Sequence, residues 1–159
     1  MKYFKMNSKV NSDSGFTIVE LLVIVLIIGV LSTVLVLTYS GVQLRQRNTT
    51  RINDIKLIQS NLETYYAQSG FYPTLAQLNS PSWTTKNLKA LDPNNMRDPG
   101  SKSTAPRFSE TPGPNQYSYQ PTALNTKSVC DDRTIACAQY VLEATLGGNS
   151  GTFVEKSLN

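Results

Sequence analysis

The stretch SDSGFTIVELLVIVLIIGVLSTVLVL, from Ser12 to Leu37, decides the fold of this chain. From Phe16 onward it is apolar, apart from one carboxylate, Glu20, and a few small or hydroxyl-bearing residues. A helix rises about 1.5 Å per residue and the hydrocarbon core is about 30 Å thick, so about 20 such residues suffice to cross it. We therefore predict a transmembrane helix over residues 16–38.

Glu20 is the unexpected residue in this helix. An ionised carboxylate in lipid costs several kcal/mol and usually has a charged partner. No basic residue stands between Phe16 and Leu44, so the partner must be the chain's own terminus or another molecule. A cleaved secretory signal and a plain signal anchor are the simpler interpretations, and lysines do precede the apolar run. Neither interpretation explains Glu20, and the run exceeds the 7–15 apolar residues of a secretory signal.

The segment GFTIVELLV, residues 15–23, resembles the processing signature of type IV pilins and of the pseudopilins of type II secretion. This resemblance implies that residues 1–15 are a leader and that a prepilin peptidase cuts between Gly15 and Phe16. It also implies N-methylation of Phe16 and pairing of Glu20 with the new terminal amine of a neighbouring subunit. A glycine at position 15 suits a peptidase that must approach the backbone closely.

The same resemblance implies a structural subunit of a type IV pilus-like filament that serves motility, adhesion or DNA uptake. Its expected partners are copies of itself, related pilins, the prepilin peptidase and an assembly platform in the membrane. The precursor is then expected in the cytoplasmic membrane with its head outside the cytoplasm, and the filament in the periplasm or outside the cell. A pseudopilin in protein export is the main alternative, and a monomeric surface-binding protein is a second. The chain lacks the helix-breaking proline of many pilins, which favours a pseudopilin or minor subunit.

Composition restricts the remaining function classes. The 159 residues allow one domain and an anchor, and the net charge of +4 is scattered. Arg45, Arg47 and Arg51 form the one basic cluster, and we expect them at the membrane interface, with contact to nucleic acid as the alternative. The chain has no histidine, so a Ser-His-Asp or Cys-His site cannot form, and we predict no enzymatic activity.

Residues 39–69 continue the helix as an amphipathic second half. Apolar side chains recur at Ile52, Ile55, Ile58 and Leu62, which is the spacing of one helical face. Gly70 and Pro73 end the pattern, so the helix should run from Phe16 to about Gln68, about 80 Å in length. The turn GFYPT that follows weakly resembles the one after the long helix of pseudopilins. Thr74 and Gln77 are spaced to cap a short helical turn.

Residues 70–159 are predicted to form a globular head. Proline-rich residues 79–115 show no sustained period and should be mostly surface loop, although an element near Trp83 to Leu91 would shorten it. The Trp83 side chain is expected to pack into the core where this loop folds back on the long helix. Alternating patterns predict antiparallel strands over residues 116–120, 138–146 and 152–156. The predicted fold class is α+β, with a small antiparallel sheet packed on the second half of a long N-terminal helix.

Cys130 and Cys137 are the chain's two cysteines. They are too few for a zinc site and wrongly spaced for a redox pair, so a disulfide is expected in a head outside the cytoplasm. Asp131, Asp132 and Asp98 are candidate calcium ligands. Calcium needs six or more oxygens, and we therefore expect solvated loop carboxylates and no cofactor.

Overall fold

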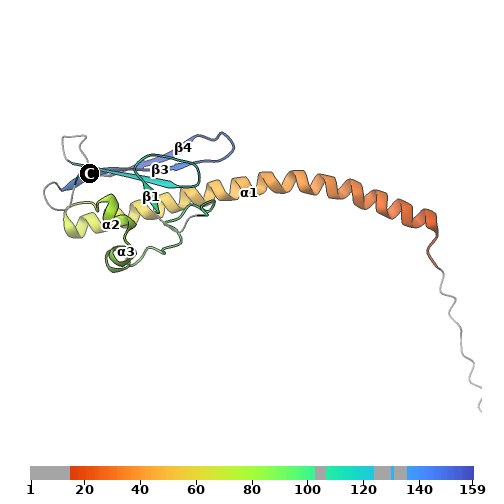
Figure 1. The fold of residues 1–159 in the computed structure, drawn as a ribbon, viewed down its shortest axis with the longest axis horizontal. Coiled ribbons are helices and arrows are strands. Elements are labelled where there is room, and N and C mark those ends of the chain that lie inside the picture. The colour runs from red at the N-terminus through yellow and green to blue at the C-terminus, as the bar shows by residue number, and fades with distance from the viewer. Residues whose placement is uncertain (1–14, 103–106, 124–129, 131–135) are drawn as a thin grey trace, which may run out of the picture. The chain divides into compact units, whose positions relative to one another are not determined.

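The computed structural model describes residues 15–102, 107–123, 130 and 136–159, with the backbone alone described over residues 34–38. The chain divides into two compact units, Met1–Ser40 and Gly41–Asn159. Helix α1, Ile18–Ser69, begins in the first unit and ends in the second. Its bounds confirm the predicted helix to within two residues at each end (Figure 1).

The first unit contains the apolar part of α1. Thr17 lies just before the helix, and its hydroxyl accepts a hydrogen bond from the Glu20 backbone N–H at 3.2 Å. Ser32 and Thr33 donate to backbone carbonyl oxygens one turn earlier, which satisfies two hydroxyls on an apolar helix. No helix in the described part of the chain has both the length and the apolar content that a membrane span needs.

The second unit begins with the amphipathic half of α1. Ile55, Ile58 and Leu62 are fully buried, which confirms the predicted apolar face. The helix ends where Gly70 adopts a φ of +78°, a left-handed conformation that glycine accepts without strain. Pro73 follows and cannot resume the helix.

Two short helices follow α1. In α2, Leu75–Asn79, Thr74 and Gln77 form a complete capping box, as predicted. Helix α3, Pro81–Asn87, begins with proline at its first turn, where a missing N–H costs nothing. Trp83 packs partly buried against the core, as expected. Helix α3 lies within the segment predicted to be mostly loop, because seven residues are too few to establish a period.

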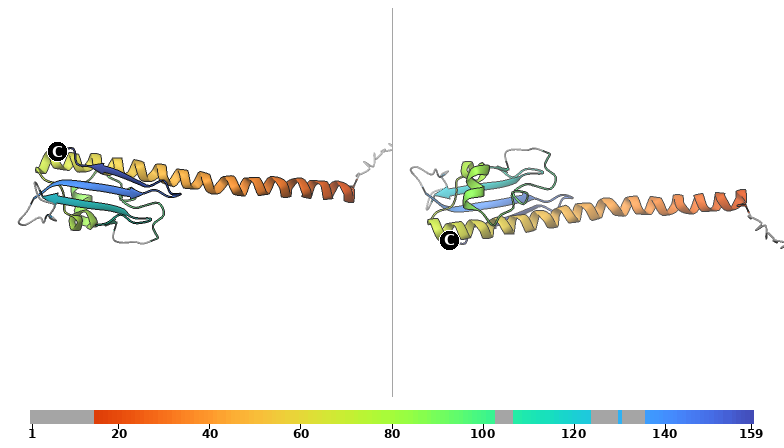
Figure 2. Two further views of the ribbon diagram at one scale, coloured as in Figure 1. Left: turned by 90° about the horizontal axis from the view of Figure 1, so that it is seen from above. Right: turned by 90° about the horizontal axis from the view of Figure 1, so that it is seen from below.

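The sheet has four strands in the order β1-β2-β3-β4. The strands are β1 Phe108–Ser109, β2 Tyr117–Ala123, β3 Cys137–Thr145 and β4 Thr152–Lys156. The last three pair antiparallel and confirm the predicted strands to within a few residues. A fourth strand was not predicted: β1 pairs parallel with β2 through two residues, which makes the sheet mixed. Figure 2 shows the sheet alongside the second half of α1.

Buried tyrosines attach this sheet to α1. Tyr117 donates from its hydroxyl to Asp54 at 2.7 Å, and Tyr140 donates to Glu63 at 2.8 Å. Tyr72 also donates to Glu63, at 2.7 Å, and burial raises the pKa of Tyr72 to about 12. A buried tyrosine needs such a partner for its hydroxyl, so these bonds fix where the sheet lies on the helix.

Candidate functional site

The predicted processing site lies at the start of the described chain. Gly15 has open space within 4 Å of the position a side chain would take, and the Phe16 side chain is 75% exposed. Glu20 lies exposed in the first turn of α1. A carboxylate there is favoured by the positive end of the helix dipole. Gly15, Phe16 and Glu20 are thus all exposed.

The helix after Glu20 exposes a long apolar surface. Its large side chains from Leu21 to Leu31 are between 43% and 68% exposed. Such a continuous apolar surface on one element requires a covering partner, either lipid or protein. One segment therefore combines the exposed Gly15 and Phe16, a nearby carboxylate and an uncovered apolar helix.

A model of the "Prokaryotic N-terminal methylation motif" matches residues 10–36. Gly15, Phe16 and Glu20 all lie in this segment. The start of the chain thus carries this methylation motif. The match agrees with the resemblance drawn from GFTIVELLV and, with the relatives below, supports the predicted similarity to pilins and pseudopilins.

Curated relatives of this chain include type II secretion system core protein G from three organisms. The protein from Vibrio cholerae serotype O1 is 28% identical over 70% of this chain and 73% of its own length. The one from Aeromonas hydrophila is 28% identical over 55% of this chain, and the match spans 61% of that relative. The one from Dickeya chrysanthemi is 32% identical over 40% of this chain and 41% of its own length. No solved structure matches.

The second unit contains a buried ion pair that the sequence did not predict. The Arg51 side chain donates to both carboxylate oxygens of Asp98, from Nε at 2.7 Å and from Nη2 at 2.9 Å. Arg51 is 4% exposed and Asp98 is also 4% exposed. The hydrogen bond to Asp98 raises the pKa of Arg51, against the effect of burial. Two parallel bonds of this kind are the strongest form of an arginine–carboxylate pair.

Two asparagines extend this ion pair into what we call the Arg51 clasp: Asn48, Arg51, Asp98 and Asn115. Asn48 accepts from Arg51 Nη1 at 3.0 Å, and Asn115 accepts from Nη2 at 3.2 Å. Asn48 also exchanges two hydrogen bonds with the backbone of Gly147, at the turn between β3 and β4. The clasp thus joins α1 to three separate parts of the head.

The clasp corrects two predictions. Arg51 was expected at the membrane interface beside Arg45 and Arg47, and instead it is buried, whereas the other two are exposed. Asp98 was expected as a solvated loop carboxylate with calcium binding as the alternative. Both its oxygens bind Arg51, and one also accepts from the Gly100 N–H at 2.7 Å.

The other calcium candidates, Asp131 and Asp132, lie outside the described residues. Within the described ranges, no three His, Cys, Asp or Glu residues gather closely enough to hold a metal ion.

The predicted disulfide between Cys130 and Cys137 is present, and both cysteines are buried. Cys137 starts β3, and its carbonyl oxygen accepts from the Tyr72 N–H at 2.8 Å. This hydrogen bond holds the start of β3 next to the turn that follows α1, and the disulfide ties Cys130 to the same place.

We expect the double variant Cys130→Ser/Cys137→Ser to lower the free energy of unfolding by about 2–3 kcal/mol, because a short loop regains its entropy in the unfolded chain. Urea titration followed by tryptophan fluorescence of Trp83 measures this difference. Reduction of the unchanged chain with dithiothreitol is the matched control and should give a similar loss. Equal stability of all three samples would contradict the expectation.

Proposed function

We propose that this chain is a structural, non-enzymatic subunit of a type IV pilus-like filament. The methylation-motif match over residues 10–36, on a helix with an uncovered apolar surface, carries the proposal. In this proposal the precursor is inserted in the cytoplasmic membrane with its head outside the cytoplasm. A prepilin peptidase removes residues 1–15, Phe16 is N-methylated, and an assembly platform adds the subunit to a filament in the periplasm or outside the cell.

Electrostatics explains why cleavage precedes assembly. Removal of the leader creates an ammonium group at Phe16. Glu20 of a neighbouring subunit is an acid without a basic residue on its own apolar segment. Pairing the two charges removes much of the cost of holding each in an apolar surrounding, so the correctly aligned contact is favoured. Each subunit uses different surfaces toward its two neighbours, and repeating such a contact yields a filament when the rotation does not close.

Mass spectrometry of the N-terminus tests the processing step. The chain purified from membranes should begin at N-methyl-phenylalanine, residue 16. Gly15→Val should leave nearly all of the chain uncut, since a branched side chain obstructs the peptidase at the scissile bond. Gly41→Ala is the matched control, because it changes a glycine that also has open space around it. A wild-type chain that retains its leader would overturn the proposed processing.

A pseudopilin of type II secretion is the second candidate. It is favoured by the relatives named core protein G and by the absence of proline between Phe16 and Glu63. Deletion of the gene distinguishes the two: a pilin deletion removes surface fibres and twitching, whereas a pseudopilin deletion stops export of a secreted enzyme. Shear fractionation excludes or supports the monomeric binding protein, since only a polymer sediments.

A further inference from the structure

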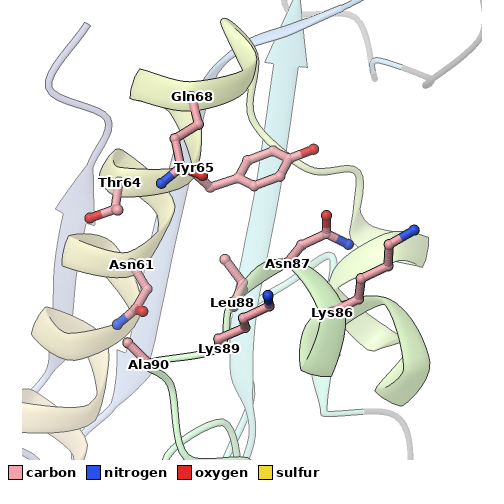
Figure 3. A pocket seen from close by; sticks show the side chains of 9 residues that line it. All are labelled: Asn61, Thr64, Tyr65, Gln68, Lys86, Asn87, Leu88, Lys89 and Ala90. Atoms are coloured by element: carbon pink, nitrogen blue, oxygen red, sulfur yellow. The ribbon is translucent and has the colours of Figure 1, made fainter.

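A polar cleft lies between the last turns of α1 and helix α3, entirely within the second unit (Figure 3). Its volume is about 310 Å³, at the lower end of the range of small-molecule sites, about 300–1,000 Å³. Helix α1 contributes Asn61, Thr64, Tyr65 and Gln68, and the opposite wall carries Lys86 and Lys89. This volume suits one or two sugar-sized rings, and none of the functions above uses the cleft.

The charge of the cleft is positive. Lys86 and Lys89 line it, whereas none of its lining residues is acidic. Among the residues that the structure describes, the one ion pair is that of Arg51 and Asp98, so both ammonium groups remain available. Two lysines three residues apart give this wall its positive charge.

The remaining polar groups favour a ligand that carries hydroxyls. Asn61 donates its amide N–H to the Leu57 carbonyl at 2.9 Å, and Asn87 donates to the Trp83 carbonyl at 2.8 Å. Each asparagine therefore keeps its amide oxygen as an acceptor on the cleft wall. Acceptors of this kind bind hydroxyl hydrogens, while the two lysines donate to an anionic group.

Tyr65 provides a fixed aromatic wall. Its ring contacts Trp83 edge-on, with centroids 5.2 Å apart, and contacts Phe71 edge-on at 6.0 Å. Figure 3 shows the ring extending from α1 across the cleft toward Asn87. A ring held by two others loses little freedom when a ligand covers it, and its apolar face suits the C–H face of a sugar.

We propose that this cleft binds a sugar acid, with its carboxylate on Lys86 and Lys89, its hydroxyls on the asparagine oxygens and its ring beside Tyr65. The sugar acid is either a free monosaccharide or one unit of an acidic polysaccharide. Both sources present the same carboxylate and hydroxyls.

The test uses the full chain in detergent, with galacturonic acid, its trisaccharide and neutral galactose as probes. Saturation-transfer NMR should show transfer to galacturonic acid or to its trisaccharide, and a weaker effect for galactose. Binding of the trisaccharide alone identifies the polysaccharide as the source, and equal binding of both acids identifies the single sugar acid. Equal binding of galactose, or no binding of either acid, would overturn the proposal.

Variants locate the site. Lys86→Gln/Lys89→Gln should weaken binding about tenfold, as expected for loss of two exposed charge contacts. Asn61→Asp should weaken binding of the acid more than the double lysine variant does, because it places a negative charge on the wall opposite the lysines. Lys102→Gln/Lys156→Gln makes the same change in net charge at residues that do not line the cleft, and should bind as the unchanged chain does. Equal weakening by the control pair would show an unspecific charge effect and overturn the assignment, and unchanged thermal unfolding shows that each variant is folded.

Discussion

Replacing Asp98 with alanine is expected to lower the free energy of unfolding by about 3–5 kcal/mol, the usual cost of leaving one partner of a buried ion pair alone. The substitution leaves the Arg51 guanidinium, 4% exposed, without the carboxylate that accepts its Nε and Nη2 bonds. It also removes the acceptor of the Gly100 N–H. The first loss falls on a guanidinium that water reaches poorly, and the second on a partly buried N–H.

Chemical denaturation of the full chain in detergent measures this effect, and Asp92→Ala is the matched control. Asp92 is an exposed carboxylate in the same segment and accepts one bond, from the Asn94 N–H at 2.8 Å. Its removal should cost less than about 1 kcal/mol. The double variant Arg51→Met/Asp98→Leu should recover most of the loss, because it removes both buried charges together. A cost for Asp98→Ala as small as that for Asp92→Ala would mean that the clasp contributes little to stability.

Replacing Glu20 with valine is expected to abolish filament assembly while leaving membrane insertion and cleavage intact. Valine suits an apolar segment better than glutamate does, so the precursor should insert normally. The neighbouring subunit's terminal ammonium would then have no acid to meet within the apolar contact. An unpaired charge in that setting costs several kcal/mol, enough to lower assembly by orders of magnitude.

Two measurements on the same cells separate assembly from processing. Shear fractions report the yield of filaments, and mass spectrometry of the membrane fraction reports the N-terminus. Glu110→Val is the matched control, since it removes an exposed carboxylate from the head and leaves α1 unchanged. Filament yield equal to that of the control, with Phe16 as the first residue, would contradict the role proposed for Glu20.

The sequence predicts those parts of the fold that short-range chemistry determines. Gly70 and Pro73 mark the end of α1, and Thr74 with Gln77 marks a helix start, because the groups that satisfy each terminus lie within a few residues. Strands β2, β3 and β4 follow from short local patterns, and alternation is clearest in β3 and β4. The processing motif is contiguous as well, so Gly15, Phe16 and Glu20 can be proposed as a site from residues 15–23 alone.

Contacts between distant residues are the part that could not be predicted. Arg51 and Asp98 stand 47 positions apart, and nothing in either local pattern distinguishes them from solvated charges. Strand β1 is two residues long and shows no alternation, so its parallel pairing depends on β2 already being in place. The cleft likewise requires α3 to lie against α1, which the spacing of lysines and asparagines does not reveal.

The Cys130–Cys137 bond sets an order of events for a subunit of the proposed kind. Disulfides form in oxidising compartments, so this bond should close only after the head has left the cytoplasm. Removal of the leader is proposed to take place at the opposite, cytoplasmic face. A mature subunit would then carry two covalent changes, leader removal from the cytoplasmic side and the disulfide from the other side of the same membrane. Measuring both in one molecule would show which of the two steps it has completed.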